Sequence, residues 1–220
     1  MALGVLFAVV MTSTPAAQAV LTAAEAHYRA MSAYRSSITH TSRILPNTPF
    51  LTSRLRLPGM PAPVHPPQVT TGELVFQNPG MVAYVEDRWG SPLGFAFGIE
   101  GDTYRQVVGT ATDRRVMELD LNKEEPLWTF VAALFVSSKP LSARCDFVVR
   151  ASGTTSVVLS GRPLLAGTQW VRVDLNLDLT THDVQSMVIV SKRGFEDELS
   201  FGSFVPTAPP GRAAFVPTVP

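Results

Sequence analysis

The sequence predicts a mainly β protein of the α+β class, with a single curved antiparallel sheet of about eleven strands beneath two helices. Three observations support this fold. Short runs of alternating apolar and polar residues recur along most of the 220 residues. Turn sequences such as those at 78–80 and 101–102 separate the runs, and only two stretches have helical spacing. Strands joined by short turns pair antiparallel, and so wide a sheet tends to curl or close.

The first nineteen residues have the features of a secretory signal peptide. An apolar run from Ala2 to Met11 is too short to span a bilayer, and Pro15 ends it. Ala17 and Ala19 occupy the −3 and −1 positions of a cleavage after Ala19. We therefore expect residues 1–19 to be removed and the mature chain to be soluble outside the cytoplasm. A buried N-terminal helix is the alternative interpretation.

The remaining chain is predicted to form one domain over residues 20–205. Its first helix is expected at 21–36, with Thr22 as N-cap, and a proline-rich loop follows at 44–69. Strands then alternate with turns until Pro126, which suits the first turn of a second helix. More strands lead to a proline-rich tail at 206–220. The residues that the two helices are expected to turn towards the sheet are Tyr28, Met31, Leu127, Phe130, Val131 and Leu134.

Alternation along the predicted strands gives the sheet one dry face. In residues 170–179 every second side chain from Val171 is apolar, with Arg, Asp and Asn between. A sheet of about eleven strands is roughly 50 Å wide, whereas a helix is about 10 Å across. The two helices cannot cover that face, so the sequence predicts an apolar hollow that binds an apolar ligand. Its expected lining residues are Leu74, Phe76, Met117, Leu119, Leu121, Val157, Leu159, Val171, Val173, Leu175, Met187, Ile189, Leu199 and Phe201.

Charge and motifs argue against several other classes of function. Charged residues make up 16% of the chain and the formal net charge is zero, which disfavours nucleic acid and anionic membranes as partners. The four histidines lack metal-ligand spacing, and no G-x-S-x-G motif occurs. Asp174 and Asp178 alternate with Asn176 as expected for a wet strand face, and Cys145 is expected to be a buried apolar residue. We expect a monomer without catalysis and without a cofactor.

The order of elements resembles that of the LolA family, the periplasmic carriers of outer-membrane lipoproteins. The stretch "GELVFQNPGMVAYVE" is similar to the family's strand–turn–strand motif, with Gly72, Leu74, Pro79 and Tyr84 at its fixed positions. "EEPLWTFVAALF" stands where the family has a mid-chain helix, and "LSFGSFVPTAPPG" looks like its closing segment. One departure is Asn78, which stands where the family has an Arg important for lid opening and transfer.

The resemblance implies an open half-barrel lidded by the N-terminal and mid-chain helices, with acyl chains bound in its interior. It further implies a soluble periplasmic carrier that shuttles a lipoprotein or lipid towards the outer membrane, with membrane-bound donor and acceptor proteins as partners. The alternative is an envelope sensor or interaction protein that uses the same fold to bind a protein partner without transporting lipid.

Overall fold

The computed structural model describes residues 15–45, 66–86, 94–109, 114–121, 123, 125–137, 139–211 and 215. Residues 46–65 of the predicted loop at 44–69 and residues 1–14 lie outside these ranges, whereas the loop's two ends belong in part to strands, with Ile44 in β1 and Gln68 and Val69 in β2. The elements in chain order are α1 (Pro15–Ala30), β1 (Ala33–Ile44), β2 (Gln68–Gln77), β3 (Met81–Glu86), β4 (Gly94–Glu100), β5 (Thr103–Gly109), β6 (Arg114–Asp120), α3 (Trp128–Phe135), the 3-10 helix η1 (Leu141–Ala143), β7 (Cys145–Ser152), β8 (Ser156–Pro163), β9 (Trp170–Asp178), β10 (Val184–Ser191), β11 (Phe195–Phe201) and β12 (Val205–Pro206).

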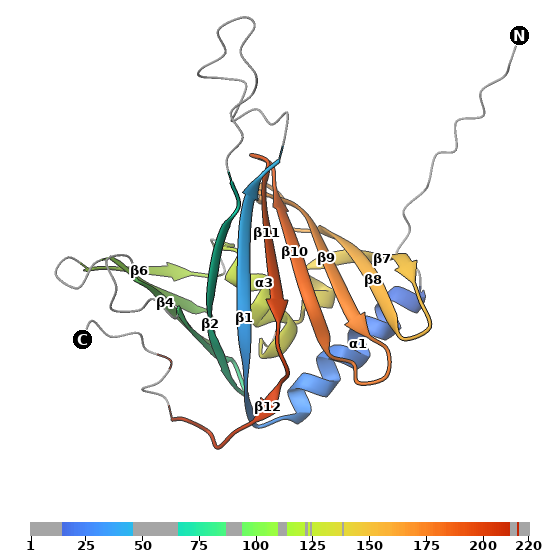
Figure 1. Ribbon diagram of the computed structural model, residues 1–220, viewed down its shortest axis with the longest axis horizontal. Helices are drawn as coiled ribbons and strands as arrows, with labels where there is room; N and C mark the ends of the chain where they lie inside the picture. Colours follow the sequence, from blue (N-terminus) through green and yellow to red (C-terminus); the bar gives the residue numbers. More distant parts are fainter. Residues whose placement is uncertain are drawn as a thin grey trace, which may run out of the picture.

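All the described strands belong to one antiparallel sheet, as predicted (Figure 1). Its order is β6-β5-β4-β3-β2-β1-β11-β10-β9-β8-β7, and β12 continues beyond β11 to pair with the start of β1. Most neighbours in the sheet are also neighbours in sequence, as expected for strands joined by tight turns. The exception is β1, which lies in the middle of the sheet between β2 and β11.

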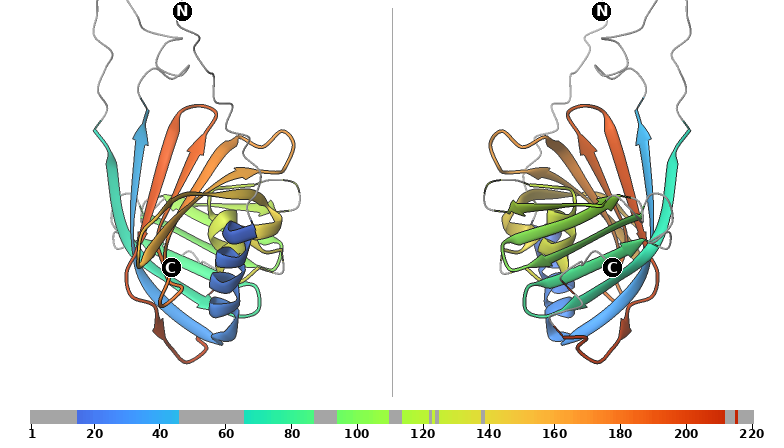
Figure 2. Two further views of the ribbon diagram at one scale, coloured as in Figure 1. Left: turned by 90° about the vertical axis from the view of Figure 1, so that its right-hand side faces the viewer. Right: turned by 90° about the vertical axis from the view of Figure 1, so that its left-hand side faces the viewer.

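The sheet curves strongly and does not close on itself, because β6 and β7 remain as its two edges. Figure 2 shows its two halves facing each other, with α1 and α3 on the concave side between them. Predictions of an open half-barrel and of two covering helices are therefore confirmed. Among the described helices, none combines the length and hydrophobicity that a membrane span requires.

The first helix begins and ends about six residues before its predicted position. Residues Ala33, Tyr34, Ser36 and Ile38 belong to β1, and Tyr34, Ser36 and Ile38 alternate as buried positions with exposed neighbours. Proline at the helix start is favourable because its missing N–H would be unsatisfied there in any case. The helix also includes Ala17, which is buried in the core, so signal cleavage after Ala19 stays a prediction.

Two glycines allow aromatic rings to lie flat on the concave face. A Cβ on Gly161 would meet the ring of Phe147, and one on Gly72 would meet the ring of Tyr84. Both rings are buried. The absence of a side chain at these positions is therefore a packing requirement of the interior.

Candidate functional site

Helix α3 fills the centre of the concave side. Its sequence, WTFVAALF, contains no charge, and all eight residues are buried. The chain enters the helix after Pro126, whose carbonyl accepts a hydrogen bond from the backbone N–H of Thr129 at 2.9 Å. A helix that is apolar on every side is stable in water only when every side is covered. Here the two halves of the sheet and helix α1 cover it.

Two aromatic clusters hold the ends of α3. The first surrounds Trp128, whose ring lies 4.5 Å from that of Phe97 and 5.1 Å from that of Tyr84. The second surrounds Phe135, whose ring lies 4.5 Å from that of Tyr28 and 4.6 Å from that of Phe76. The first cluster consists of Tyr84, Phe97, Tyr104 and Trp128, and the second of Tyr28, Tyr34, Phe76, Phe135 and Phe204. Each pair of rings adds to the packing energy beyond the area that it buries.

Most of the residues expected to line the interior come together in this core. Leu74, Phe76, Leu121, Val157, Leu159, Val173, Leu175, Met187, Ile189 and Leu199 are buried in one cluster with Tyr28, Phe130, Val131 and Leu134. Leu119, Phe201, Met31 and Leu127 are partly buried against the same cluster. Sequence reasoning did not single out Phe97, Tyr104 or Phe204. Phe97 and Ile99 lie two residues apart, on the same face of β4, so the alternation along that strand could have identified Phe97. Phe204 lies in an irregular segment, where no such pattern exists.

Two of the expected lining residues lie outside the core. Val171 is 43% exposed because the register between β9 and β10 shifts at that point, pairing Arg172 with Val190 and Trp170 with Ser191. This bulge removes Val171 from the alternation and leaves Trp170 buried. Met117 is 42% exposed because β6 is an edge strand that extends beyond the helices.

Around the centre of the described core, side chains pack without gaps. Phe76, Phe130 and Leu175 have 0% of their surface exposed, so no space large enough for water adjoins them. The area comparison that predicts a hollow does not include the size of the side chains on α3. The helix carries three large rings, those of Trp128, Phe130 and Phe135. These rings occupy space between the helix backbone and the sheet.

The β2–β3 turn fastens the ends of both helices. The side-chain amide of Asn78 donates hydrogen bonds to the carbonyls of Tyr28 at 2.9 Å and Met31 at 2.7 Å, which end α1. The backbone N–H of Gly80 donates to the carbonyl of Val136 at 3.0 Å, directly after α3. Gly80 has a φ of 74°, a conformation that glycine adopts without strain. The same turn thus joins the sheet, α1 and α3.

The structure is similar to solved structures over almost its whole length. A DUF1329 family protein from Desulfovibrio piger matches with a TM-score of 0.51 and 8% identity, covering 93% of this chain and 98% of that one. A proposed outer-membrane lipoprotein-sorting protein domain from Vibrio parahaemolyticus matches with 0.50 and 10%, covering 91% and 96%. These two structures share the fold of this chain. A LolA superfamily protein from Nitrosomonas europaea matches with 0.47 and 11%, covering 91% and 97%. No protein-family model and no curated protein sequence matches the chain.

Asn78 is the residue at which the resemblance to the LolA family led us to expect a basic side chain. Its amide supplies two N–H donors, both of which are used on carbonyls at the end of α1. An Asn can therefore hold a helix end by neutral hydrogen bonds, without a charge. With Asn78 in place of a basic residue, this turn lacks a charge, but it stays attached to the end of α1.

Three further polar contacts hold α1 and α3 in place. Glu25 is 2% exposed and accepts hydrogen bonds from the backbone N–H and the hydroxyl of Ser142, at 2.8 and 2.9 Å. Burial raises the pKa of Glu25 above its ordinary value, although these hydrogen bonds and Arg29 oppose the shift. The Tyr28 hydroxyl accepts from the backbone N–H of Val184 at 2.7 Å, and the Tyr34 hydroxyl donates to the carbonyl of Phe135 at 3.3 Å.

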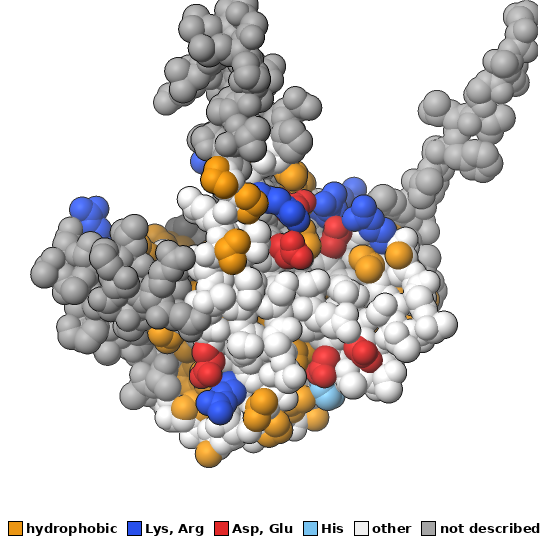
Figure 3. Space-filling model, in the orientation of Figure 1, with side chains coloured by type: hydrophobic (Ala, Val, Ile, Leu, Met, Phe, Trp, Pro, Cys, Tyr) orange, Lys and Arg blue, Asp and Glu red, His pale blue; other side chains and the backbone are white. Residues whose placement is uncertain are grey.

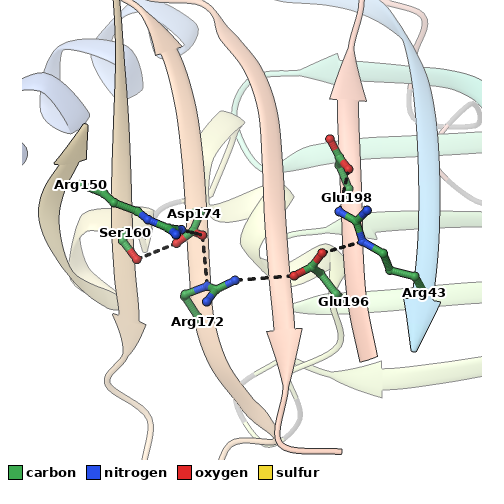
Figure 4. Close-up of polar contacts among 7 residues, drawn as sticks. All are labelled: Arg43, Arg150, Ser160, Arg172, Asp174, Glu196 and Glu198. Atoms are coloured by element: carbon green, nitrogen blue, oxygen red, sulfur yellow. Dashed lines mark hydrogen bonds and ion pairs between the residues drawn. The ribbon is translucent and has the colours of Figure 1, made fainter. Parts of the chain in front are cut away.

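The charged residues considered for catalysis are engaged in structural pairs. Asp174 lies on the outer face, where it accepts a hydrogen bond from Ser160 at 2.6 Å and pairs with Arg150 and Arg172 (Figure 4). Cys145 is buried, and burial raises the pKa of its thiol. Within the described ranges, no group of His, Cys, Asp and Glu is placed to hold a metal ion.

Proposed function

We propose that the protein is a periplasmic carrier that binds acyl chains of a lipoprotein or another lipid between the sheet and α3, and that the structure is its closed, unloaded state. The observation that supports this best is α3 itself. It is an uncharged helix lying between the two halves of a sheet whose facing residues are almost all apolar. A hydrocarbon chain is a chemically equivalent filling for the same space.

Displacement of α3 by an acyl chain is reasonable in energy. Burying a methylene group contributes about 0.8 kcal/mol, so a twelve-carbon chain contributes roughly 10 kcal/mol before the ordering of the chain is subtracted. This must offset the loss of packing around the rings of α3. A short or polar ligand offers no such compensation, so the proposal is specific for long apolar chains.

For α3 to move, its end at Phe135 must separate from the ring cluster that surrounds Phe135. It is attached through the hydrogen bonds from Gly80 to Val136 and from Tyr34 to Phe135. Each such bond contributes about 1 kcal/mol net. The fold shared with a proposed lipoprotein-sorting domain supports the same class of ligand. No covalent chemistry is involved, and release requires only an acceptor with a higher affinity for the chain.

The fluorescence of Trp128 tests this proposal. In a variant with Trp89 and Trp170 replaced by Phe, Trp128 is the single tryptophan, packed against Phe97 and Tyr84. Titration with a triacylated lipopeptide should change its emission in a saturable way, because α3 must leave the interior. The same peptide without acyl chains is the control. An unchanged emission, together with an organic extract of the purified protein that contains no lipid, would contradict the proposal.

The second candidate is an envelope interaction protein that binds a protein partner without carrying lipid. The observation that favours it is the close packing around Phe76, Phe130 and Leu175, which have no exposed surface. It predicts a specific partner captured from a periplasmic extract. It also predicts that the emission of Trp128 does not respond to any lipopeptide.

A further inference from the structure

A group of large apolar side chains is exposed at one end of the sheet. Leu164 and Leu165 are consecutive in the loop between β8 and β9, and they are 55% and 50% exposed. Val171, turned outward by the β9 bulge, is 43% exposed close to the same loop. Single exposed apolar residues are ordinary on protein surfaces, but adjacent ones on a projecting loop mark contact sites.

Basic side chains accompany these apolar residues. Arg162 is exposed at the end of β8, and Lys192 and Arg193 are exposed in the turn between β10 and β11. A hydrogen bond of 2.7 Å from the backbone N–H of Lys192 to the carbonyl of Gln169 joins this turn to the β8–β9 loop. We name the group the β8–β9 rim; it consists of Arg162, Leu164, Leu165, Val171, Lys192 and Arg193.

Two acidic residues on the neighbouring strands are neutralised by arginines. Asp174 pairs with Arg150 and Arg172, and Glu196 pairs with Arg172 and Arg43, as Figure 4 shows. These pairs form a row across the outer face of β9, β11 and β1, and Figure 3 shows Lys and Arg side chains gathered at this end of the molecule.

The charges of the rim itself remain free. Within the described part of the chain, none of its three basic side chains forms an ion pair, and Asp146, the cross-strand neighbour of Arg162, is the acidic residue beside them. A formal net charge of zero for the whole chain therefore conceals a local positive excess at the rim.

We propose that the β8–β9 rim docks the protein on an anionic lipid surface. Leu164 and Leu165 would enter the interface between headgroups and acyl chains, while Arg162, Lys192 and Arg193 lie among the anionic headgroups. Two apolar side chains beside unpaired basic ones complement an anionic bilayer, in which negatively charged headgroups cover an apolar interior. The docking is reversible because the inserted apolar area is small. It does not depend on whether the interior carries lipid.

Co-sedimentation with protein-free vesicles tests the proposal. The protein should bind vesicles of phosphatidylcholine and phosphatidylglycerol at low salt, and far less to phosphatidylcholine alone. L164S/L165S should weaken binding at least about tenfold. R162Q/K192Q/R193Q should weaken it about a hundredfold on anionic vesicles, since each basic residue near such a surface contributes about fivefold. Thermal unfolding confirms that the variants are folded, which is expected at exposed positions.

Matched controls come from other parts of the surface. Val116 is 58% exposed on β6, and the Lys123 side chain is 80% exposed, so V116S and K123Q should leave vesicle binding unchanged. Absence of binding to anionic vesicles would overturn the proposal, and so would equal losses in the rim and control variants. Binding only to membranes that contain proteins would also overturn it, in favour of a protein partner.

Discussion

Asn78 is the residue whose side chain holds the end of α1 against the sheet. We expect N78A to lower the free energy of unfolding by about 2 kcal/mol, because two buried carbonyls lose their donors. The variant should also load acyl chains faster, since α1 and the neighbouring α3 are released more readily. Urea unfolding and stopped-flow fluorescence measure the two effects. N176A, which loses an exposed hydrogen bond to Gln185, is the control and should change neither.

Glu25 should make stability depend on pH. Its pKa is raised in the folded protein, so its favourable contribution is complete below the ordinary value of 4.5 and is lost as pH rises through the raised pKa. E25Q removes this titration but keeps an acceptor for Ser142. The stability of the variant relative to the wild type should therefore increase from pH about 4.5 towards neutrality. Urea unfolding at a series of pH values measures this, and parallel profiles would rule it out.

Gly161 should tolerate no side chain. We expect G161A to destabilise the protein by about 1–3 kcal/mol, because the added methyl group would overlap the buried ring of Phe147. Gly153 provides the comparison, since a Cβ there would have its nearest neighbour at 3.5 Å, an ordinary contact. G153A should change stability by less than about 0.5 kcal/mol in the same denaturant series. If the two substitutions lowered stability equally, the requirement for glycine at position 161 would come from backbone freedom and not from ring packing.

At the scale of elements, the short strand β12 anchors the segment that follows the sheet. Phe204, just before it, packs on Tyr28 and Phe135, which belong to different helices. F204A should therefore lower stability by about 2 kcal/mol and loosen both helices. V205A alters a side chain that is 47% exposed on the same strand and should have little effect. Hydrogen exchange of α1 and α3 distinguishes the outcomes, because a purely local effect would leave their protection unchanged.

The sequence predicted elements well wherever a regular pattern continued without interruption. Alternation along β9 placed Val173 and Leu175 correctly in the core. It failed at Val171 because a bulge adds one residue without changing the hydrophobic pattern. The start of α1 was misplaced because its alanine-rich first turns also suit a signal peptide, whereas the polar residues of β1 suit several structures.

The predicted hollow depends on more than the pattern of the strands. The residues expected to line it do meet in one core, so the concave face was identified correctly. The prediction of a ligand-binding hollow rests on the widths of elements alone. Side-chain volumes also matter, and the large rings of Trp128, Phe130 and Phe135 reduce the space beneath the sheet. The part played by Asn78 needed coordinates, because its partners lie 50 and 47 residues away in sequence.

At the scale of the whole molecule, β1 needs β11 as a neighbour. The two strands pair over seven positions, and β11 also carries Glu196 and Asp197, which bind Arg43 and His40 of β1. A chain that ends at residue 194 should therefore lack cooperative unfolding, because the sheet would separate into two incomplete halves. A chain that ends at residue 211 keeps every strand that the structure describes and is the control. Calorimetry distinguishes them, and a cooperative transition in the shorter chain would disprove this requirement.

The central place of β1 also constrains how the protein reaches its native state. His40 and Asp197 are 157 residues apart in sequence, yet they are direct partners across β1 and β11. Closing so long a loop is entropically unfavourable and makes assembly slow. A ribosome must therefore have synthesised the chain as far as β11 before β1 can pair on both sides. Until then one edge of β1 is open, and it can pair with a strand of another chain instead.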